Sequence, residues 1–291
     1  MQFFIRHDVL SHLDYLPEQT TWDLPTLRSA RPLPTVTPPP TVAMANGVEV
    51  RIFTPRSLPA NTPPRLVMVS IHGGGYVAGK AQQDDTKNAQ LCELLQAIVI
   101  APEYRLAPEY PLPAAWDDCI AVTQWAIKKY DAPIFIHGDS AGGGLAYAVG
   151  CTLRSLVTGV ILFEPCIDPS MSYESFITHE HGPFWTRRAA IHAWAATVGD
   201  GVAALPFPKP SAPYPPTVVV VNPVDPLRDE GIALATGLVD VGTEAELHFY
   251  PGTVHATLSA PESHIWPEIQ TLIKRFVDSQ ITTYSQPKDL E

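Results

Sequence analysis

The chain has 291 residues, of which 45% are apolar and 17% are charged. Acidic residues outnumber basic residues by 30 to 19, which gives a formal net charge of -11. The apolar fraction excludes a disordered protein, and the length fits one large domain or two small ones. Because the chain is acidic and holds no block of Lys or Arg, we expect it to bind neither nucleic acid nor an anionic membrane.

Targeting signals and cysteines narrow the class of protein further. The apolar N-terminal run ends at Arg6, before it reaches the roughly 7–15 apolar residues of a signal peptide. No apolar run approaches the ~18 residues of a transmembrane helix, so stable membrane insertion is not expected. No pair of cysteines has metal-ligand spacing, and all four lie far apart in apolar contexts: Cys92, Cys119, Cys151 and Cys166. The sequence therefore predicts a cytoplasmic protein with free, buried thiols.

Proline marks the irregular parts of the chain. There are 31 prolines, about twice the usual share of roughly 5%, and they gather in residues 1–65 and 206–226. Proline fixes φ and lacks a backbone donor, so these stretches favour extended or turning chain. Within the first stretch we expect a short amphipathic segment near residues 4–15, little regular structure from Pro25 to Pro40, and a strand over Val48–Phe53.

From residue 65 onward, short β-rich runs alternate with helical patterns. The β-rich runs contain much Val and Ile between Gly, Pro or Asp residues, and we expect strands at Arg65–Ile71, Ala97–Ala101, Pro133–His137, Gly159–Phe163, Thr217–Val221 and Ala245–Tyr250. Helical periodicity occurs at Asp84–Gln96, Ala114–Tyr130, Ala141–Arg154, Arg187–Val198, Asp229–Val241 and Ser263–Asp278. Such alternation is typical of an α/β fold with a mostly parallel sheet and helices on both faces. We therefore expect one α/β domain, with the proline-rich stretches outside its core.

A glycine-rich segment, His72-Gly73-Gly74-Gly75, directly follows the strand expected to end at residue 71. Successive glycines let the chain turn backbone N–H groups toward one point, with no side chain in the way. Hydrolysis of an ester builds negative charge on the carbonyl oxygen, and fixed N–H groups stabilise that charge. We expect Gly73 and Gly74 to serve as these donors, together with Ala141. For His72, a structural role in holding the loop is favoured over metal binding or base catalysis.

The strand expected over Pro133–His137 runs into Gly138–Gly142, which reads Gly-Asp-Ser-Ala-Gly, and a helical pattern follows. Gly-x-Ser-x-Gly between a strand and a helix is the sequence of a nucleophile elbow, a sharp turn that exposes the serine hydroxyl above a sheet. The flanking glycines let neighbouring backbone approach without a Cβ clash. A phosphate-binding loop would have a Lys after the glycines, and none is present. The motif therefore predicts that Ser140 is a nucleophile.

A nucleophilic serine needs a histidine base, and the base needs a carboxylate that fixes its tautomer and stabilises its cation. In this kind of fold both follow later strands, in the order Ser, Asp, His. Asp225 comes just after the strand over Thr217–Val221, whereas Asp229 falls where the next helix begins and is expected to cap it. His255 is the histidine on the loop after the following strand. The sequence therefore predicts a triad of Ser140, Asp225 and His255.

Taken as a set, the motifs resemble those of the hormone-sensitive lipase family of esterases. The resemblance covers the chain from about Leu66 to the end, and it rests on four segments: His72–Gly75, Glu103–Glu109, Gly138–Gly143 and Asp225–Gly231. The segment Tyr250–Ala256 is similar to that of the bacterial acetyl-esterase branch. One departure is Thr257, where the family commonly has an aromatic residue, so we expect looser packing around His255.

The resemblance implies an α/β-hydrolase fold with a small cap and no metal or organic cofactor. It implies the site residues that the motifs indicate, with Ser140, Asp225 and His255 as the triad and Gly73, Gly74 and Ala141 as oxyanion donors. Residues 1–291 then form a single domain whose cap comes from about 1–40 and 168–210. Aromatic residues of these segments are expected to line an apolar pocket or to pack the cap on the core: Phe3, Phe4, Phe184 and Trp185.

These features predict a serine carboxylesterase that hydrolyses short-chain acyl esters, acetyl to about hexanoyl, through an acyl-enzyme. The short acyl chain is implied by the family branch and the small cap. Two alternatives stay open: amide cleavage by the same machinery, as in an arylformamidase or a peptidase, and a non-catalytic ligand-binding protein on a hydrolase scaffold. The expected partner is a small-molecule ester, and the sequence leaves open a homodimer, the natural substrate and the enantiopreference.

Overall fold

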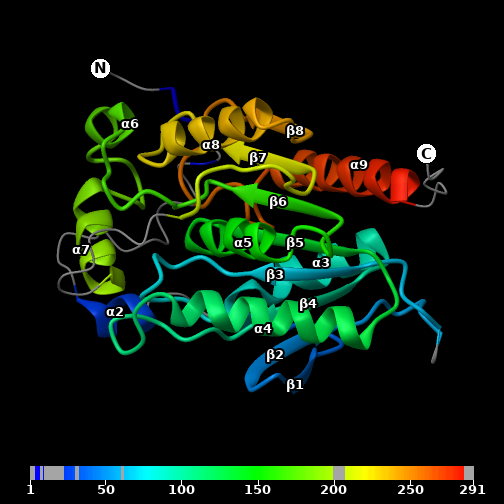
Figure 1. Ribbon diagram of the computed structural model, residues 1–291. Coiled ribbons are helices and arrows are strands. Elements are labelled where there is room, and N and C mark those ends of the chain that lie inside the picture. Colours follow the sequence, from blue (N-terminus) through cyan, green and yellow to red (C-terminus); the bar gives the residue numbers. More distant parts are fainter. Residues whose placement is uncertain are drawn as a thin grey trace.

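Eight strands form one sheet in the order β1-β2-β4-β3-β5-β6-β7-β8 (Figure 1). The computed structural model describes residues 4–6, 9, 23–29, 33–59, 62–198 and 207–284. The strands are β1 (Thr41–Ala45), β2 (Val48–Phe53), β3 (Val67–Ile71), β4 (Ile98–Pro102), β5 (Ile134–Asp139), β6 (Gly159–Phe163), β7 (Thr217–Val221) and β8 (Ala245–Phe249). All pairs from β4 to β8 are parallel, whereas β2 pairs antiparallel with both β1 and β4. The predicted, mostly parallel sheet is confirmed.

Strand β1 is the one strand of this sheet that the sequence patterns do not predict. It forms a hairpin with β2 that turns at Asn46 and Gly47, where φ is 49° and 91°. Asn-Gly is the pair most typical of such two-residue turns, because both positions need a positive φ. Val42 and Met44 of β1 are apolar but exposed at the sheet edge. The strand therefore does not show the alternation of buried apolar and exposed polar residues by which a strand is predicted from sequence.

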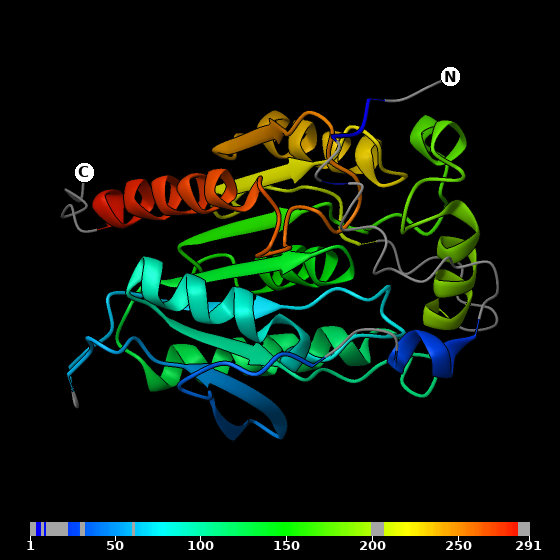
Figure 2. The same ribbon diagram turned by 180° about the vertical axis from the view of Figure 1, so that it is seen from behind.

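Helices cover both faces of the sheet, as predicted. Figure 1 views the face covered by α4 (Ala114–Lys129), α5 (Ala141–Thr152) and α8 (Arg228–Asp240). Figure 2 views the opposite face, where α3 (Asp85–Leu95) and α9 (Trp266–Tyr284) lie. The sequence predicts all five, although α9 begins three residues later and ends six residues later than expected from Ser263–Asp278.

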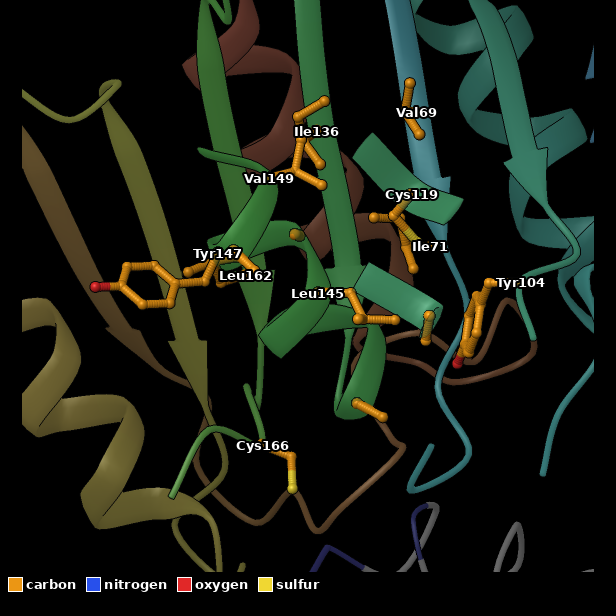
Figure 3. Close-up of a cluster of buried hydrophobic side chains, with 14 of the residues drawn as sticks. Val69, Ile71, Tyr104, Cys119, Ile136, Leu145, Tyr147, Val149, Leu162 and Cys166 are labelled. Carbon is orange, nitrogen blue, oxygen red and sulfur yellow. The ribbon is translucent and has the colours of Figure 1, made fainter. Parts of the chain in front are cut away.

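Two apolar layers hold the helices on the sheet. The layer under α4 and α5 is drawn in Figure 3, and it includes Leu145 and Val149 of α5, Ile136 of β5 and Leu162 of β6. The other layer includes Phe135 of β5, whose ring meets Phe276 of α9 edge to face at 6.3 Å. Burying both faces of the sheet is what makes its central strands continuous runs of apolar residues.

The remaining short helices gather beyond the carboxyl ends of the parallel strands (Figure 1). They are α2 (Leu24–Ser29), α6 (Glu174–Thr178) and α7 (Arg187–Val198), and a 3-10 turn, η1 (Ala81–Asp84), directly precedes α3. Helix α2 corrects the expectation of little regular structure after Pro25, because proline fits the first turn of a helix, where its missing N–H costs no bond. Most of the amphipathic segment expected near residues 4–15 lies outside the described residues, as do parts of the expected cap, including residues 199–206.

Within the described ranges, no helix is both long enough and apolar enough to cross a membrane. The four cysteines are free thiols. Three of them are buried, as expected, and Cys151 is partly exposed.

Candidate active site

Ser140 lies at the turn between β5 and α5, with φ 54° and ψ -117°. A non-glycine residue reaches such angles only under strain that the surrounding structure stabilises. A Cβ atom at Gly138 would collide with the carbonyl oxygen of Gly142, and one at Gly142 would collide with the carbonyl oxygen of Ile71. The two glycines therefore let the strand, the turn and the helix pack closely enough to hold the serine in this conformation.

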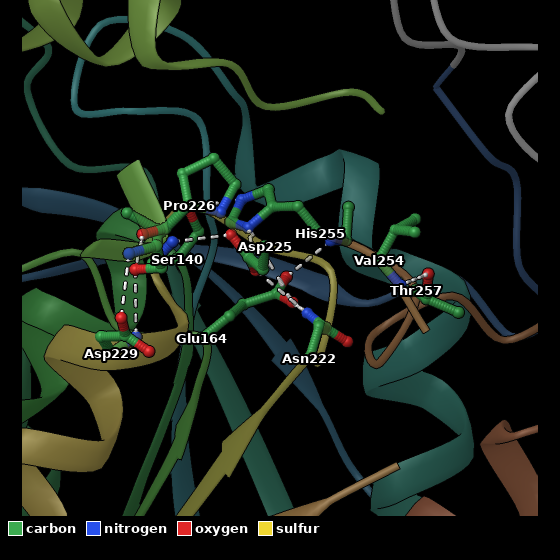
Figure 4. Close-up of polar contacts among 12 residues, drawn as sticks. Ser140, Glu164, Asn222, Asp225, Pro226, Asp229, Val254, His255 and Thr257 are labelled. Atoms are coloured by element: carbon green, nitrogen blue, oxygen red, sulfur yellow. Dashed lines mark hydrogen bonds and ion pairs between the residues drawn. The ribbon is translucent and has the colours of Figure 1, made fainter. Parts of the chain in front are cut away.

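The structure brings the three predicted triad residues together (Figure 4). His255 Nε2 lies 3.0 Å from Ser140 Oγ, and His255 Nδ1 lies 2.8 Å from Asp225 Oδ2. Asp225 follows β7 and His255 follows β8, and a parallel bridge between Val224 and Val254 joins the two loops just before these residues. The chain of contacts runs from carboxylate to imidazole to hydroxyl, which is the order that base activation of a serine requires.

The imidazole of His255 is 3% exposed. Burial lowers the pKa of His255, but the carboxylates of Asp225 and Glu164 outweigh burial and raise this pKa to about 9. Asp225 is itself held by the backbone N–H of Leu227, which donates to Oδ1 at 2.9 Å. In its neutral form, a histidine fixed against a serine hydroxyl is suited to take the proton of that hydroxyl, and the nearby carboxylates stabilise the imidazolium that results.

Thr257 does not leave the His255 loop loose, contrary to the expectation from the missing aromatic residue. Its hydroxyl accepts a hydrogen bond from the Val254 N–H at 3.2 Å, and its own N–H donates to the Val254 carbonyl at 3.1 Å. The rings of Phe184 and Trp185 lie 5.9 Å and 5.8 Å from the imidazole. The hydrogen bonds between Thr257 and Val254 hold the loop in a tight turn. The aromatic packing on His255 comes from Phe184 and Trp185, which precede α7.

The three residues expected as oxyanion donors lie near the serine. A Cβ atom at Gly73 would lie 3.4 Å from Ser140 Cβ, and Gly74 has φ 127°, a conformation that favours glycine. Ala141 is the first residue of α5, so its N–H has no acceptor within the helix. Gly73 and Gly74 line the same cavity as Ser140, and Ala141 directly follows the serine, so the structure brings the three residues expected as donors to one part of the molecule.

His72 packs as the structural residue that the sequence favours. Its Nδ1 lies 2.7 Å from the Gly73 carbonyl, and its ring stacks on Tyr104 with the ring centroids 4.2 Å apart. The Tyr104 hydroxyl donates to the His72 carbonyl at 2.8 Å. These contacts fix the beginning of the glycine-rich segment.

A cavity of about 100 Å³ opens at Ser140 and His255. Phe184 and Trp185 form part of its wall, as does Leu27 of α2. Phe4 is 71% exposed and packs on Gly252 instead, and Phe3 lies outside the described residues. Two of the four aromatic residues expected to line a pocket therefore do so.

Two anchors tie the short helices to the site. The hydroxyl of Ser175 in α6 donates to the Pro226 carbonyl at 2.6 Å, and the Ser175 N–H donates to Asp229 at 2.9 Å. Arg28 of α2 donates to the Val77 carbonyl at 2.8 Å, four residues after Gly73. Asp229 thus contacts the segment of α6, and the short helices are fixed to the loops that carry Asp225 and Gly73.

A buried cluster of charged residues contacts Asp139, the residue before Ser140 in the turn between β5 and α5. The Lys87 ammonium forms ion pairs with Asp84, at 3.0 Å, and with Asp139, the residue before the serine. Burial lowers the pKa of Lys87, but Asp139 and Asp84 outweigh it and raise this pKa. The lysine therefore stays charged in the interior and pairs with both carboxylates. His137, whose Nε2 lies 3.3 Å from Asp139, completes the cluster.

Two polar residues at the site escape the sequence motifs. Glu164 directly follows β6, and Asn222 directly follows β7; both are buried. The only sequence signal for Glu164 is an acidic residue at the end of an apolar strand, and no motif contains it.

In the described part of the chain, Glu164, Asp225 and His255 form a group whose ligand atoms lie within 4.8 Å of one another, as a metal site needs. Their atoms already bond to one another's loops and to Ser140, so a metal ion would have to displace these contacts.

Comparison with known proteins identifies the family. A family model described as the alpha/beta hydrolase fold matches residues 68–259. The chain therefore belongs to the alpha/beta hydrolase family, and the resemblance to esterases of the hormone-sensitive lipase type is confirmed.

Individual relatives agree with this assignment. The chain is 31% identical over 229 residues to esterase LipI of Mycobacterium tuberculosis, covering 72% of this chain and 71% of that protein. It is 30% identical over 227 residues to carboxylesterase NlhH of the same organism, covering 72% of this chain and 70% of that protein. Among solved structures, bacterial heroin esterase is similar with a TM-score of 0.80 and 29% identity, over 94% of this chain and 98% of that chain.

The glycine-rich segment yields a testable prediction. Gly74→Ala adds a Cβ that collides with the Ala78 carbonyl oxygen at a φ of 127°, so the segment must move and its N–H groups lose their alignment. We expect kcat for p-nitrophenyl butyrate to fall roughly 10²–10³-fold, the loss that follows removal of an oxyanion donor, with the native fold retained by circular dichroism. The matched control is Gly47→Ala in the β1–β2 turn, which also has a positive φ but open space around it. Equal losses of kcat in both variants would contradict the assigned role.

Proposed function

We propose that this protein is a serine carboxylesterase that acts through a covalent acyl-enzyme. The observation that carries the proposal is the buried chain of contacts from Asp225 through His255 to Ser140, with distances of 2.8 Å and 3.0 Å. The relatives named esterases and carboxylesterases support ester hydrolysis as the class of reaction.

In the first half of the proposed cycle, His255 Nε2 takes the proton of Ser140 as Oγ attacks the ester carbonyl carbon. The carbonyl π electrons move to the oxygen, and the N–H groups of Gly73, Gly74 and Ala141 stabilise the resulting oxyanion. When the tetrahedral species collapses, the bond to the alcohol oxygen breaks. His255 gives its proton to that oxygen, so the alcohol leaves neutral and the acyl group stays on Ser140.

In the second half, water replaces the alcohol. His255 takes a proton from the water as the water oxygen attacks the acyl carbon, and the same amides stabilise the second oxyanion. Collapse breaks the bond to Ser140 Oγ, which regains a proton from His255. Throughout the cycle, Asp225 orients the imidazole and stabilises the imidazolium.

The substrate proposed for this site is an ester of a short acyl chain, acetyl to about hexanoyl. The cavity of about 100 Å³ and the large rings of Phe184 and Trp185 in its wall support a small apolar group. A Cβ atom at Gly75 would lie 2.8 Å from the tip of the Trp185 ring, so this ring closes the cavity against the oxyanion segment.

The nucleophile is tested by Ser140→Ala. Without the hydroxyl no acyl-enzyme forms, and we expect kcat for p-nitrophenyl butyrate to fall by a factor on the order of 10⁶ while the melting temperature stays close to that of the wild type. Ser70→Ala, at a buried serine of β3, is the control and keeps its turnover. Activity retained by a folded Ser140→Ala variant would refute the proposal, and faster turnover of formyl-kynurenine than of any ester would favour an amide hydrolase.

Acyl-chain preference is tested by a series of p-nitrophenyl esters from acetyl to dodecanoyl. We expect kcat/KM of the wild type to peak at or below hexanoyl. In Trp185→Ala the cavity gains the space of the ring, so the ratio of kcat/KM for octanoyl over butyryl ester rises about tenfold or more. Trp116→Ala, which removes a ring that stacks on Phe207, serves as the control. A wild-type optimum at decanoyl or beyond, or the same change in Trp116→Ala, would reject this account of the cavity.

A further inference from the structure

Glu164 is a buried carboxylate at the site for which the proposed cycle has no use. It directly follows β6, next to the strand whose end carries Asp225, and it is 1% exposed. Its backbone has φ 41°, a conformation that favours glycine. Burying a carboxylate costs free energy unless the carboxylate is paired, and a strained backbone adds to this cost. The contacts of Glu164 must therefore offset both.

Both oxygens of Glu164 bind groups of the triad loops. Oε1 accepts the N–H of Ala256, the residue after His255, at 2.8 Å. Oε2 accepts a hydrogen bond from the Asn222 side-chain amide, and the same amide nitrogen donates to Asp225 Oδ2 at 3.1 Å. Asn222 thus links the two carboxylates, as Figure 4 shows.

The two carboxylates face the same ring nitrogen. Asp225 Oδ2 lies 2.8 Å from His255 Nδ1, and Glu164 Oε2 lies 3.9 Å from it. At this distance in a buried site, a negative charge stabilises an imidazolium strongly, since little water screens the pair. Glu164 also lines the cavity at Ser140, on the same side as the base.

The charges around Glu164 make its ionisation depend on His255. Burial, with smaller contributions from Asp225 and Asp139, raises the pKa of Glu164 to about 7 against the lowering effects of His255 and of the hydrogen bond from the Ala256 N–H. Lys87 pairs with Asp139 and is the nearby cation of the buried charged cluster. Because Glu164 and His255 interact, their apparent pKa values belong to the pair, and a proton gained by the imidazole favours the ionised form of Glu164.

We propose that Glu164 is a positioning residue for the base, a second carboxylate that holds the His255 loop through Ala256 and stabilises the imidazolium together with Asp225. Asn222 keeps the two carboxylates at a fixed separation. The inference rests on the proposed hydrolysis by Ser140 and His255, and it adds to that mechanism a second source of negative charge for the base.

The pH dependence of kcat/KM in Glu164→Gln tests the charge. The amide keeps the size of the side chain but removes the negative charge, so the pKa of His255 falls. We expect the acidic limb of kcat/KM for p-nitrophenyl butyrate to move to lower pH by about 1 unit. We expect kcat on the alkaline plateau to fall about tenfold, since the imidazolium formed in the transition state is less stable.

The matched control is Glu230→Gln. Glu230 is equally buried and accepts the N–H of Asp168 at 2.8 Å, but it forms no ion pair with His255 among the contacts of the described residues. The control is expected to change the melting temperature without moving the acidic limb. A folded Glu164→Gln variant whose acidic limb stays at the wild-type pH would overturn the inference.

In Glu164→Gln, the new side-chain NH2 group faces the NH2 group of Asn222, and two donors cannot bond to each other. A second variant covers the case in which this mismatch prevents folding. Glu164→Gly relieves the strain at φ 41° and opens a space the size of the side chain. We expect this variant to lose kcat about tenfold and to regain most of it with formate, a small carboxylate, but not with formamide, its neutral counterpart. Equal rescue by both, or by neither, would overturn the inference.

The outcome is separable from that of the proposed function. If Ser140→Ala keeps its turnover, the proposed mechanism fails and Glu164 has no base to serve. If Ser140→Ala is inactive while Glu164→Gln keeps the wild-type acidic limb, the mechanism stands and only the role of Glu164 is rejected.

Discussion

The burial of the His255 imidazole is the constraint on which the rest of the site depends. In the proposed cycle this ring gains and loses a proton in each half, although it is 3% exposed. A cation in such a place is unstable unless negative groups face it. Asp225 at 2.8 Å supplies the first such group, and the raised pKa of His255, about 9, is the electrostatic result of the carboxylates around it. The geometry therefore stabilises the charged ring where a solvent-exposed ring would rely on water.

The parallel sheet explains how so many polar groups reach one place. Residues that follow β3, β5, β6, β7 and β8 all emerge at the same edge of the sheet, because parallel strands end on the same side. Gly73, Ser140, Glu164, Asp225 and His255 are the contributions of these strands. Helices α6 and α2 are fixed to the same loops by Ser175 and Arg28, so the walls of the cavity and the polar groups at Ser140 form one connected structure.

The sequence was sufficient to place the residues that a motif marks or that directly follow the end of a predictable strand. Ser140 is marked by its flanking glycines, and Asp225 and His255 are marked by the ends of predictable strands. Other features lacked such a signal. Strand β1 lies at an exposed edge and carries no burial pattern, although Asn46-Gly47 is itself a hairpin signal. Glu164 and Asn222 matter through contacts between strands that are far apart in the sequence, and only the sheet order brings those strands together.

The most direct test of the account is covalent labelling by diethyl p-nitrophenyl phosphate, followed by intact and peptide mass spectrometry. The account predicts one diethylphosphoryl group per chain, on Ser140, with activity lost in proportion to labelling. Because His255 removes the proton of Ser140, the variant His255→Ala should label roughly 10²–10⁴-fold more slowly. A wild-type protein that hydrolyses esters but is not labelled at Ser140, or a His255→Ala variant that is labelled at the wild-type rate, would contradict the central claim.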